Sequence, residues 1–581
     1  MPPGPRLTHR LAPALALALG VLLTACGGGG GGSSGGGSTP GPSPEPSLPA
    51  LAPLSDRDAV RLADQASFGA TEALVASLKS QSAVAWVQAQ MALPASRYSD
   101  GGDDRVHVNT DGFICDDPGA PVQCWRDYYS AEPLVRDFYR NALGGSDQLR
   151  QRVALALQQI LVVSDREVSG TYGLRRYQQL FLDLAFDNYR EVLRRVALSP
   201  VMGDYLDHAN NDPTAPNENF ARELLQLFSL GTCLLQPDGS LQTGTCQPTY
   251  DNATVRAYAY ALTGWTYPAG GSTRWGCWPQ GSNCTYYGGD MVALPARHDK
   301  EARSLLSGRN KAASSTPVQA LDTVLDSLME HPNMAPFIGR QMIQALVTSN
   351  PSPAYVERVA LAFSTGSFVA NGRSFGQRQR GDLAATVAAV LLDAEARGDT
   401  PPANAGRLRE PVLFMTGTLR LLDGRSDGDA MGYWWGEQLN QHLFHAPSVF
   451  NFYPPDYPVP GTTLVGPAFG IHNANTALAR LNFLSFFIDQ GGAQPNPELA
   501  NAIGTKLSLA GWTARADDGA KLLDQMSMTL LGRALPEASR SAVQDAVNAW
   551  TDKTNPNDWR ERRVRTAALL LLASPQYQVP R

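Results

Sequence analysis

The clearest hydrophobic pattern in the chain lies between Thr316 and Glu330. Apolar side chains recur there at i, i+3, i+4 and i+7, the spacing of one helical face: Leu321, Val324, Leu325 and Leu328. Thr316 is a residue type that caps helix N-termini, and Pro317 is well suited to the first helical position. The segment is therefore predicted to be an amphipathic helix that begins just after Thr316.

The same helical period continues along most of the chain. Further helices are predicted at 177–197 and from three starting points, namely Ser55, Ser146 and Asp558, the last of these ending at Ser574-Pro575. Alternating strand patterns are scarce, and one small hairpin is expected within 268–295, where Gly, Asn and Ser interrupt an aromatic-rich stretch. The predicted fold class is mainly α: a large multi-helix globular body with disulfide-stapled loops and at most a small β-hairpin.

The first 25 residues have the pattern of an export signal. A basic start precedes an apolar stretch, 11–23, which is too short and too interrupted by Pro13 to anchor stably in a bilayer. The sequence Leu23-Thr24-Ala25-Cys26 resembles a lipobox, which predicts cleavage before Cys26 and acylation of its thiol, for example with palmitate. An ordinary secretory signal with a chance cysteine is the alternative. Gly27, where an aspartate would favour the inner membrane, points to an outer-membrane lipoprotein facing the periplasm or the cell surface.

Residues 26–54 follow as a predicted tether. Gly and Ser dominate 27–37 and Pro is frequent in 38–53, so this segment has nothing with which to pack a core. The folded part is expected from 55 to 581, about 525 residues, as one helical body or two packed subdomains. No later apolar run approaches the roughly 20 residues that cross a membrane, so the lipid is the expected membrane attachment.

Six cysteines remain once Cys26 is assigned to lipid. They allow fifteen connectivities, and the turn-rich sequence within each close pair favours the sequential one: Cys115 with Cys124, Cys233 with Cys246, and Cys277 with Cys284. Such cysteine usage is typical of an oxidising compartment. A zinc site is the competing interpretation, but the chain has no Cys-x2-Cys spacing.

Charge and motifs exclude several common functions. Removal of Arg6 and Arg10 with the signal leaves 46 basic against 54 acidic residues, which gives no nucleic-acid footprint. Gly-x-Ser-x-Gly occurs in the Gly/Ser-rich stretch 27–37, at 372–376 and at 424–428, but none of these lies between a predicted strand and a predicted helix, as a nucleophile elbow does. The chain contains no His-Glu-x-x-His zinc helix, P-loop or dinucleotide-binding fingerprint. The common hydrolase and nucleotide-dependent chemistries therefore lose support.

The most distinctive local sequence runs from Asn217 to Gly231. Its apolar residues share one helical face and its polar residues another, the two sets being Phe220, Leu224, Leu227 and Phe228, and Asn219, Arg222, Glu223 and Gln226. Glu218 and Arg222 form an i,i+4 ion pair in the favourable order, and Gly231 is the expected helix terminator. One interpretation is a self-satisfied polar network; the other makes Glu218 or Glu223 a general acid/base or cation ligand.

A loop just upstream is rich in oxygen ligands. Asp207, Asn210 and Asp212 are candidate Ca²⁺ ligands, although no EF-hand spacing is present and a solvated loop with Asx turns needs no metal. No other cofactor is expected beyond such a divalent cation. One imidazole, that of His208, belongs to this loop. A second His-Asp step is His298-Asp299, and His442 and His445 stand later on either side of Phe444.

These segments together resemble a known bacterial family. The Asn217–Gly231 run, Leu262 to Thr266 with Trp265, Ala446 to Tyr453, and Arg565 to Tyr577 resemble the signature of the family catalogued as domain of unknown function 1800. The resemblance implies a large, mainly helical exported protein, often encoded beside a second exported family related in fold to sulfatases and phosphatases. The family's His-Asp-x-Gly-x-Lys pattern is broken after His298-Asp299, where Lys300-Glu301-Ala302 follows.

Two functions remain. The favoured one is a lipid-anchored protein that binds or assembles an extracellular polymer or a partner protein, through polar residues such as Asn217, Asn219, Arg222 and Trp265 and through aromatic loops. These loops contain Trp275, Trp278, Tyr286 and Tyr287; Tyr433, Trp434 and Trp435; and Phe450, Phe452, Tyr453 and Tyr457. The alternative is a periplasmic or surface hydrolase that uses Glu218 and Glu223 with His208 or His298.

Overall fold

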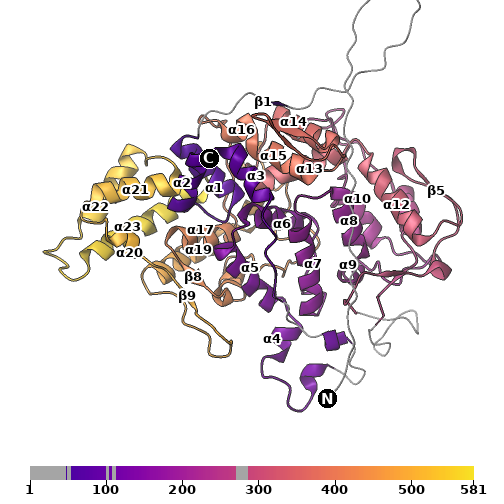
Figure 1. Ribbon diagram of the computed structural model, residues 1–581, viewed down its shortest axis with the longest axis horizontal. Helices are drawn as coiled ribbons and strands as arrows, with labels where there is room; N and C mark the ends of the chain where they lie inside the picture. Colours follow the sequence, from indigo (N-terminus) through magenta and orange to yellow (C-terminus); the bar gives the residue numbers. More distant parts are fainter. Residues whose placement is uncertain (1–46, 49–53, 100–103, 108–112, 270–285) are drawn as a thin grey trace, which may run out of the picture. The chain divides into compact units, whose positions relative to one another are not determined.

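The computed structural model describes residues 47–48, 54–99, 104–107, 113–269 and 286–581. These residues form 24 α-helices and only short strands, which confirms the mainly helical fold class (Figure 1). Within the described residues, no helix combines the length and the apolar character needed to cross a membrane. The predicted signal, most of the predicted tether and Cys26 lie outside the described residues.

Local capping explains where the predicted helices begin. Helix α1 (Asp56–Ala66) starts after Ser55, whose side chain accepts a hydrogen bond from the Asp58 backbone. Helix α12 (Pro317–Met329) starts after Thr316, which forms a reciprocal capping box with Gln319. Helix α23 (Trp559–Ala573) ends at Ser574, as expected from the proline that follows. These three boundaries confirm the sequence predictions.

The stretch predicted as one helix at 177–197 is divided in two. Helix α7 (Thr171–Asp183) ends before a short turn, and α8 (Tyr189–Leu198) begins anew after Asn188. The Asn188 side chain accepts from the Arg190 backbone at 3.0 Å and so caps α8. A cap inside an otherwise periodic stretch therefore splits the helix.

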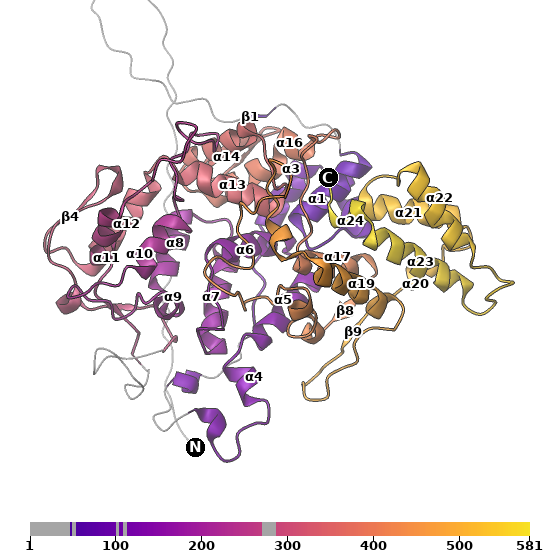
Figure 2. The same ribbon diagram turned by 180° about the vertical axis from the view of Figure 1, so that it is seen from behind.

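Helices distant in sequence pack into one continuous hydrophobic cluster that extends from Ala59 to Tyr577. At its centre α13 (Met334–Leu346) packs against α14 (Pro353–Thr365), α15 (Leu383–Leu392) and α6 (Gln148–Ile160), and α6 packs against α7. Helix α12 contacts α8 and α11 (Asn252–Ala261). Three C-terminal helices lie side by side in both views (Figures 1 and 2): α21 (Gly519–Leu531), α22 (Glu537–Asn548) and α23.

The strands are short and pair in several places rather than in one hairpin. Strands β2 (Trp265–Thr266) and β3 (Val292–Ala293) pair antiparallel around the predicted hairpin region, whose residues 270–285 lie outside the description. Two more antiparallel pairs are β4 (Arg303–Ser304) with β5 (Asn310–Lys311) and β8 (Arg425–Ser426) with β9 (Thr505–Lys506). Strand β6 (Phe368–Ala370) pairs with β7 (Arg373–Phe375), and with β1 (Ser47–Leu48), which lies inside the predicted tether.

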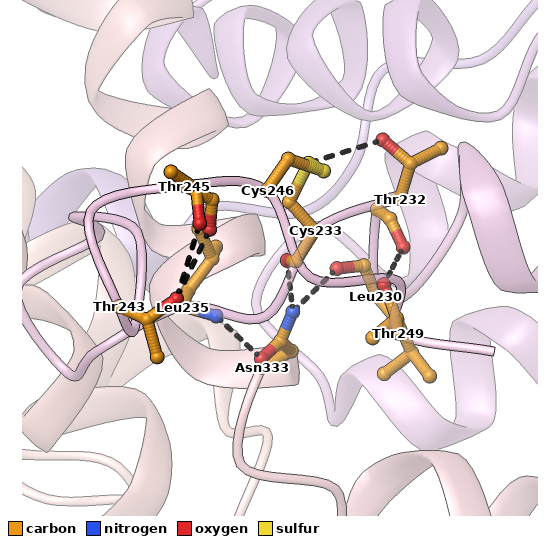
Figure 3. Close-up of a disulfide and its surroundings, with 10 residues drawn as sticks. Leu230, Thr232, Cys233, Leu235, Thr243, Thr245, Cys246, Thr249 and Asn333 are labelled. Carbon is orange, nitrogen blue, oxygen red and sulfur yellow. Dashed lines mark hydrogen bonds between the residues drawn. A yellow bond between two sulfur atoms is a disulfide. The ribbon is translucent and has the colours of Figure 1, made fainter.

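Two of the three predicted disulfides are present among the described residues, Cys115–Cys124 and Cys233–Cys246. The second closes a loop that Asn333 holds against α13 (Figure 3). The Asn333 side chain donates to the carbonyls of Leu230 and Cys233 at 3.1 and 2.7 Å, and accepts from the Leu235 backbone at 3.0 Å. Cys277 and Cys284 lie outside the described residues, so their bond stays a prediction.

Candidate functional site

The predicted site helix is shorter than its sequence pattern. Helix α10 (Asn219–Gln226) ends five residues before Gly231, so this glycine is not its terminator. Gly231 does adopt φ of 73°, and a Cβ there would lie 2.6 Å from the Phe337 ring. The glycine is required by the close approach of Phe337 and by its left-handed backbone.

The polar residues at the start of α10 bond mainly to one another. Arg222 forms the predicted ion pair with Glu218 at 3.0 Å, and the Asn217 side chain accepts from the Asn219 backbone at 2.8 Å. The Asn219 side chain in turn donates to Asp207 at 3.3 Å. This arrangement matches the interpretation of a self-satisfied polar network for Glu218, Arg222, Asn217 and Asn219.

Glu223 differs from its neighbours because it is buried without a partner. Its Oε2 atom has no hydrogen-bond partner among the described residues, and burial raises the pKa of its carboxyl despite the opposing charge of Arg222. Its charge also contributes to the raised pKa values of Tyr205 and Tyr250, whose main cause is burial. Glu223 therefore has the environment of a general acid, but Glu218, in an ion pair, does not.

His208 lies in the interior of the protein. Its ring stacks on Phe220 with centroids 4.4 Å apart, and burial lowers its pKa to about 3, although the Ala197 backbone opposes this shift. The imidazole is therefore neutral at physiological pH. Trp265 is buried too, and its carbonyl accepts from the Asn210 backbone at 2.7 Å.

The oxygen-rich loop is committed to local bonds. Asn210 accepts from the Thr266 hydroxyl at 2.6 Å, and Asp212 accepts from the Thr214 backbone at 2.8 Å in an Asx turn. Asp207 and Asn210 both have positive φ, 55° and 61°. The calcium role of Asp207, Asn210 and Asp212 stays a prediction, and the observed bonds are those of a turn.

His298 and Asp299 are buried as well, in a group of their own. Nδ1 of His298 donates to the Thr263 carbonyl at 2.8 Å, and burial lowers the pKa of this imidazole. Asp299 binds the guanidinium of Arg303 at 2.8 and 2.9 Å and lies 3.3 Å from Nζ of Lys311. Arg303 stands where the family pattern has its lysine, so a cation is kept at that position.

The predicted catalytic residues thus belong to separate local networks. Among the described residues, no hydrogen bond or ion pair joins Glu223 to His208 or to His298.

Three neighbouring pockets lie in another part of the protein, and Arg407 lines all three. We call them the aromatic pocket, of about 120 Å³, the arginine pocket, of about 50 Å³, and the outer pocket, of about 470 Å³.

The aromatic pocket is lined by a polar floor and by aromatic side chains at its rim. Phe450 lies at the rim, and its side chain is 52% exposed. Glu410, the N-cap residue of α17 (Pro411–Leu421), lies at its floor, where three groups donate to its Oε2, namely the side chains of Gln159 and Gln441 at 2.6 Å and the Tyr453 hydroxyl at 2.7 Å. The Oε2 atom of Glu410 therefore has its acceptor capacity largely used.

Arg407 lies at the junction of these three pockets, and its guanidinium has few bonding partners. Its side chain is 12% exposed, its nearest carboxylate oxygen is Glu410 Oε1 at 3.8 Å, and no hydrogen bond of its guanidinium is found among the described residues. Burial lowers the pKa of Arg407. Burial and the charge of Arg407 also lower the pKa of Arg152, to about 9. Positive charge is thus concentrated here in a chain whose formal net charge is −6.

The arginine pocket extends this positive charge. Arg533 borders both the arginine and outer pockets, and burial together with the charges of Arg57 and Arg581 lowers its pKa. Arg409 is paired with Asp64 at 2.5 Å and so adds no free charge. Guanidinium groups around a cavity that keep unused donors form a binding site for carboxylate, sulfate or phosphate groups.

A family model described as "Protein of unknown function (DUF1800)" matches residues 61–579, nearly the whole chain. The chain belongs to this family. Neither a search of curated proteins nor a search of solved structures found a match. The resemblance seen in the sequence is thereby confirmed, and it adds no mechanism to this DUF1800 protein.

Part of the junction around Arg407 in this DUF1800 chain could be predicted from its sequence. Phe450 and Tyr453 were expected in a binding loop, but Glu410 and Arg407 were given no role. The available signal was the run Arg407-Leu408-Arg409-Glu410-Pro411, in which three charges directly precede an apolar helix. Elsewhere the expected aromatic loops differ: Tyr287 and Trp435 are buried, Tyr433 and Trp434 are exposed, and Trp275 and Trp278 lie outside the described residues.

One group in the described part of the DUF1800 chain has the composition and spacing of a metal site. It consists of Glu437, His442 and His445. Both histidines flank Phe444 in the sequence, and no function was expected of them. This group is separate from the pockets around Arg407, since none of its members lines them.

Proposed function

We propose that this protein is a lipid-anchored protein of the cell envelope that binds an acidic saccharide of an extracellular polymer. The observation that supports this most is Arg407, a mostly buried guanidinium without a close ionic partner where three pockets meet. The Glu410 carboxylate is the ionic partner of Arg407, but at 3.8 Å it is too distant for a hydrogen bond. A buried charge with so weak a partner is costly, and an anionic ligand would relieve that cost.

The aromatic pocket supports a ring-bearing ligand. Aromatic faces stack on sugar rings, and the half-exposed Phe450 offers such a face beside the hydrogen-bonded floor of Glu410 and Tyr453. Gln341 also lines this pocket, and its buried Nε2 atom has no hydrogen-bond partner among the described residues. The outer pocket, about 470 Å³, has the volume of a ligand site. The proposed orientation places the acidic group at Arg407 and the ring against Phe450.

Two substitutions test this orientation. Arg407→Met is expected to weaken retention on dextran sulfate or polygalacturonate about tenfold or more, because a hydrogen bond to a charged group contributes about 1.5–3 kcal/mol. Phe450→Ala is expected to weaken it less, since only ring contacts are lost. Retention is measured by affinity electrophoresis of the full-length protein in detergent, with neutral dextran as the comparison polymer.

Matched controls separate the pocket from general surface effects. Arg425→Met removes an exposed arginine and Trp125→Ala an exposed tryptophan, both outside the three pockets. Neither change is expected to alter retention. Equal retention of wild-type protein on neutral and acidic polymers, or equal losses in the controls and the pocket variants, would contradict the proposed function.

A further inference from the structure

We propose that Glu437, His442 and His445 bind one divalent transition-metal ion of the zinc type. One ligand atom from each of the three side chains lies within 4.8 Å of the other two. A tetrahedral zinc ion with ligands at about 2.0–2.2 Å draws such atoms together by small rotamer changes. Two imidazoles with one carboxylate suit zinc, whereas calcium and magnesium prefer oxygen ligands only. This inference is independent of saccharide binding at Arg407.

The backbone around the two histidines is fixed on both sides. They follow α18 (Trp435–Gln438), and Phe444 between them has φ of 63°. The Phe444 carbonyl accepts from the Asp165 backbone at 3.0 Å, and the Ala446 carbonyl accepts from the Ser164 hydroxyl at 2.7 Å. The segment is therefore held against Ser164 and Asp165, where a turn at 165–167 begins.

Each imidazole has a carboxylate on its second nitrogen. Nδ1 of His445 donates to Asp165 at 2.5 Å, which fixes the tautomer that leaves Nε2 for a metal ion. Asp165 is itself held by the Ala131 backbone at 2.9 Å. Nε2 of His442 lies 2.8 Å from Glu132, although its N–H does not point straight at the oxygen, and Nδ1 lies 3.0 Å from Glu437. Glu132 and Asp165 are thus positioned as the supporting carboxylates of a metal site.

The local charge favours a cation. Three carboxylates, those of Glu132, Asp165 and Glu437, surround two imidazoles, and no lysine or arginine of the described chain forms an ion pair with any of the three. A divalent ion would offset this negative charge and bind both histidines.

The proposed site is open on one side. The side chains of Glu437 and His445 are 42% and 29% exposed, and the ring of Tyr433, which is 75% exposed, stands nearly perpendicular to the His442 ring with centroids 6.3 Å apart. With three protein ligands, a fourth position is left for water or a ligand, as in catalytic rather than structural zinc sites.

Metal titration of the full-length protein in detergent tests the proposal. After removal of metal with a chelator, ZnCl₂ is expected to bind at one ion per chain by calorimetry, and CoCl₂ to give the visible absorption of a tetrahedral site. His445→Gln and Glu437→Gln should each weaken binding at least tenfold. Glu437 is half-exposed, so its variant is not expected to disturb folding.

A positioning variant and a control complete the test. Asp165→Asn keeps all three ligands and is expected to weaken zinc binding about 10–100-fold with a shifted cobalt spectrum. His472→Gln removes a histidine outside the group and should change nothing. Absence of saturable zinc binding, or binding that persists unchanged in Glu437→Gln and His445→Gln, would overturn the proposal.

Discussion

Glu223 shows at the scale of one residue how burial and ionisation compete. Its carboxylate lies in the interior with one oxygen unpaired, so burial disfavours its charged form and raises its pKa above the ordinary value of 4.5. The folded protein therefore binds this proton more tightly than the unfolded chain does. Stability from this group is present below about pH 4.5 and is lost as pH rises through the raised pKa.

We predict that Glu223→Gln raises the melting temperature at about pH 7.5, because glutamine keeps the shape of the side chain without its charge. The difference from wild type should vanish at about pH 4, where Glu223 is protonated. Glu218→Gln is the control: it removes the ion pair with Arg222 and is expected to leave the melting temperature unchanged or lower. A lower melting temperature for Glu223→Gln at about pH 7.5 would mean that the carboxylate has a cationic partner.

Among the helices, α12 is the one whose sequence specifies its start most completely. Thr316 and Gln319 cap each other's backbone, and Pro317 occupies the first helical turn. Thr316→Ala is predicted to lower the free energy of unfolding by about 1 kcal/mol. Thr316→Ser keeps the capping oxygen and should cost much less. Chemical denaturation of both variants measures the difference, and equal losses would show that the cap contributes nothing.

Helix ends set by distant contacts could not be predicted from sequence. The pattern of α10 continues to Gly231, but the regular helix stops at Gln226. The backbone N–H groups of Leu227 and Phe228 both donate to the Glu223 carbonyl, so the chain leaves the helix in a wider turn. The Tyr189 hydroxyl donates to the Phe228 carbonyl at 2.8 Å. The α7–α8 break carried a local signal in Asn188, and its capping role could have been recognised.

At the scale of the whole molecule, the candidate site too could be predicted from the sequence only in part. Chemistry-bearing residues could be named from sequence where they are neighbours, as in Asn217–Gly231. The junction at Arg407 combines Gln159 from α6, Glu410 at the start of α17 and Phe450 from a later loop. No local pattern brings these segments together, because helix packing alone makes them neighbours.

The proposed membrane attachment concerns the whole chain and has its own test. We predict that wild-type protein expressed in a Gram-negative host incorporates labelled palmitate and sediments with outer membranes. Cys26→Ser should abolish labelling and release the protein to the soluble fraction. Labelling that persists in Cys26→Ser would show that the lipid, if present, is attached elsewhere.

The central claim is that Arg407 recognises an anionic saccharide, and calorimetry tests it most directly. Full-length protein is titrated with a galacturonate oligosaccharide and with a neutral glucose oligosaccharide of equal length, at about 0.15 M salt. We predict saturable binding of the acidic ligand alone, weakened at least about tenfold by Arg407→Met and unchanged by Arg425→Met. Equal binding of the two oligosaccharides, or binding to neither, would contradict the account.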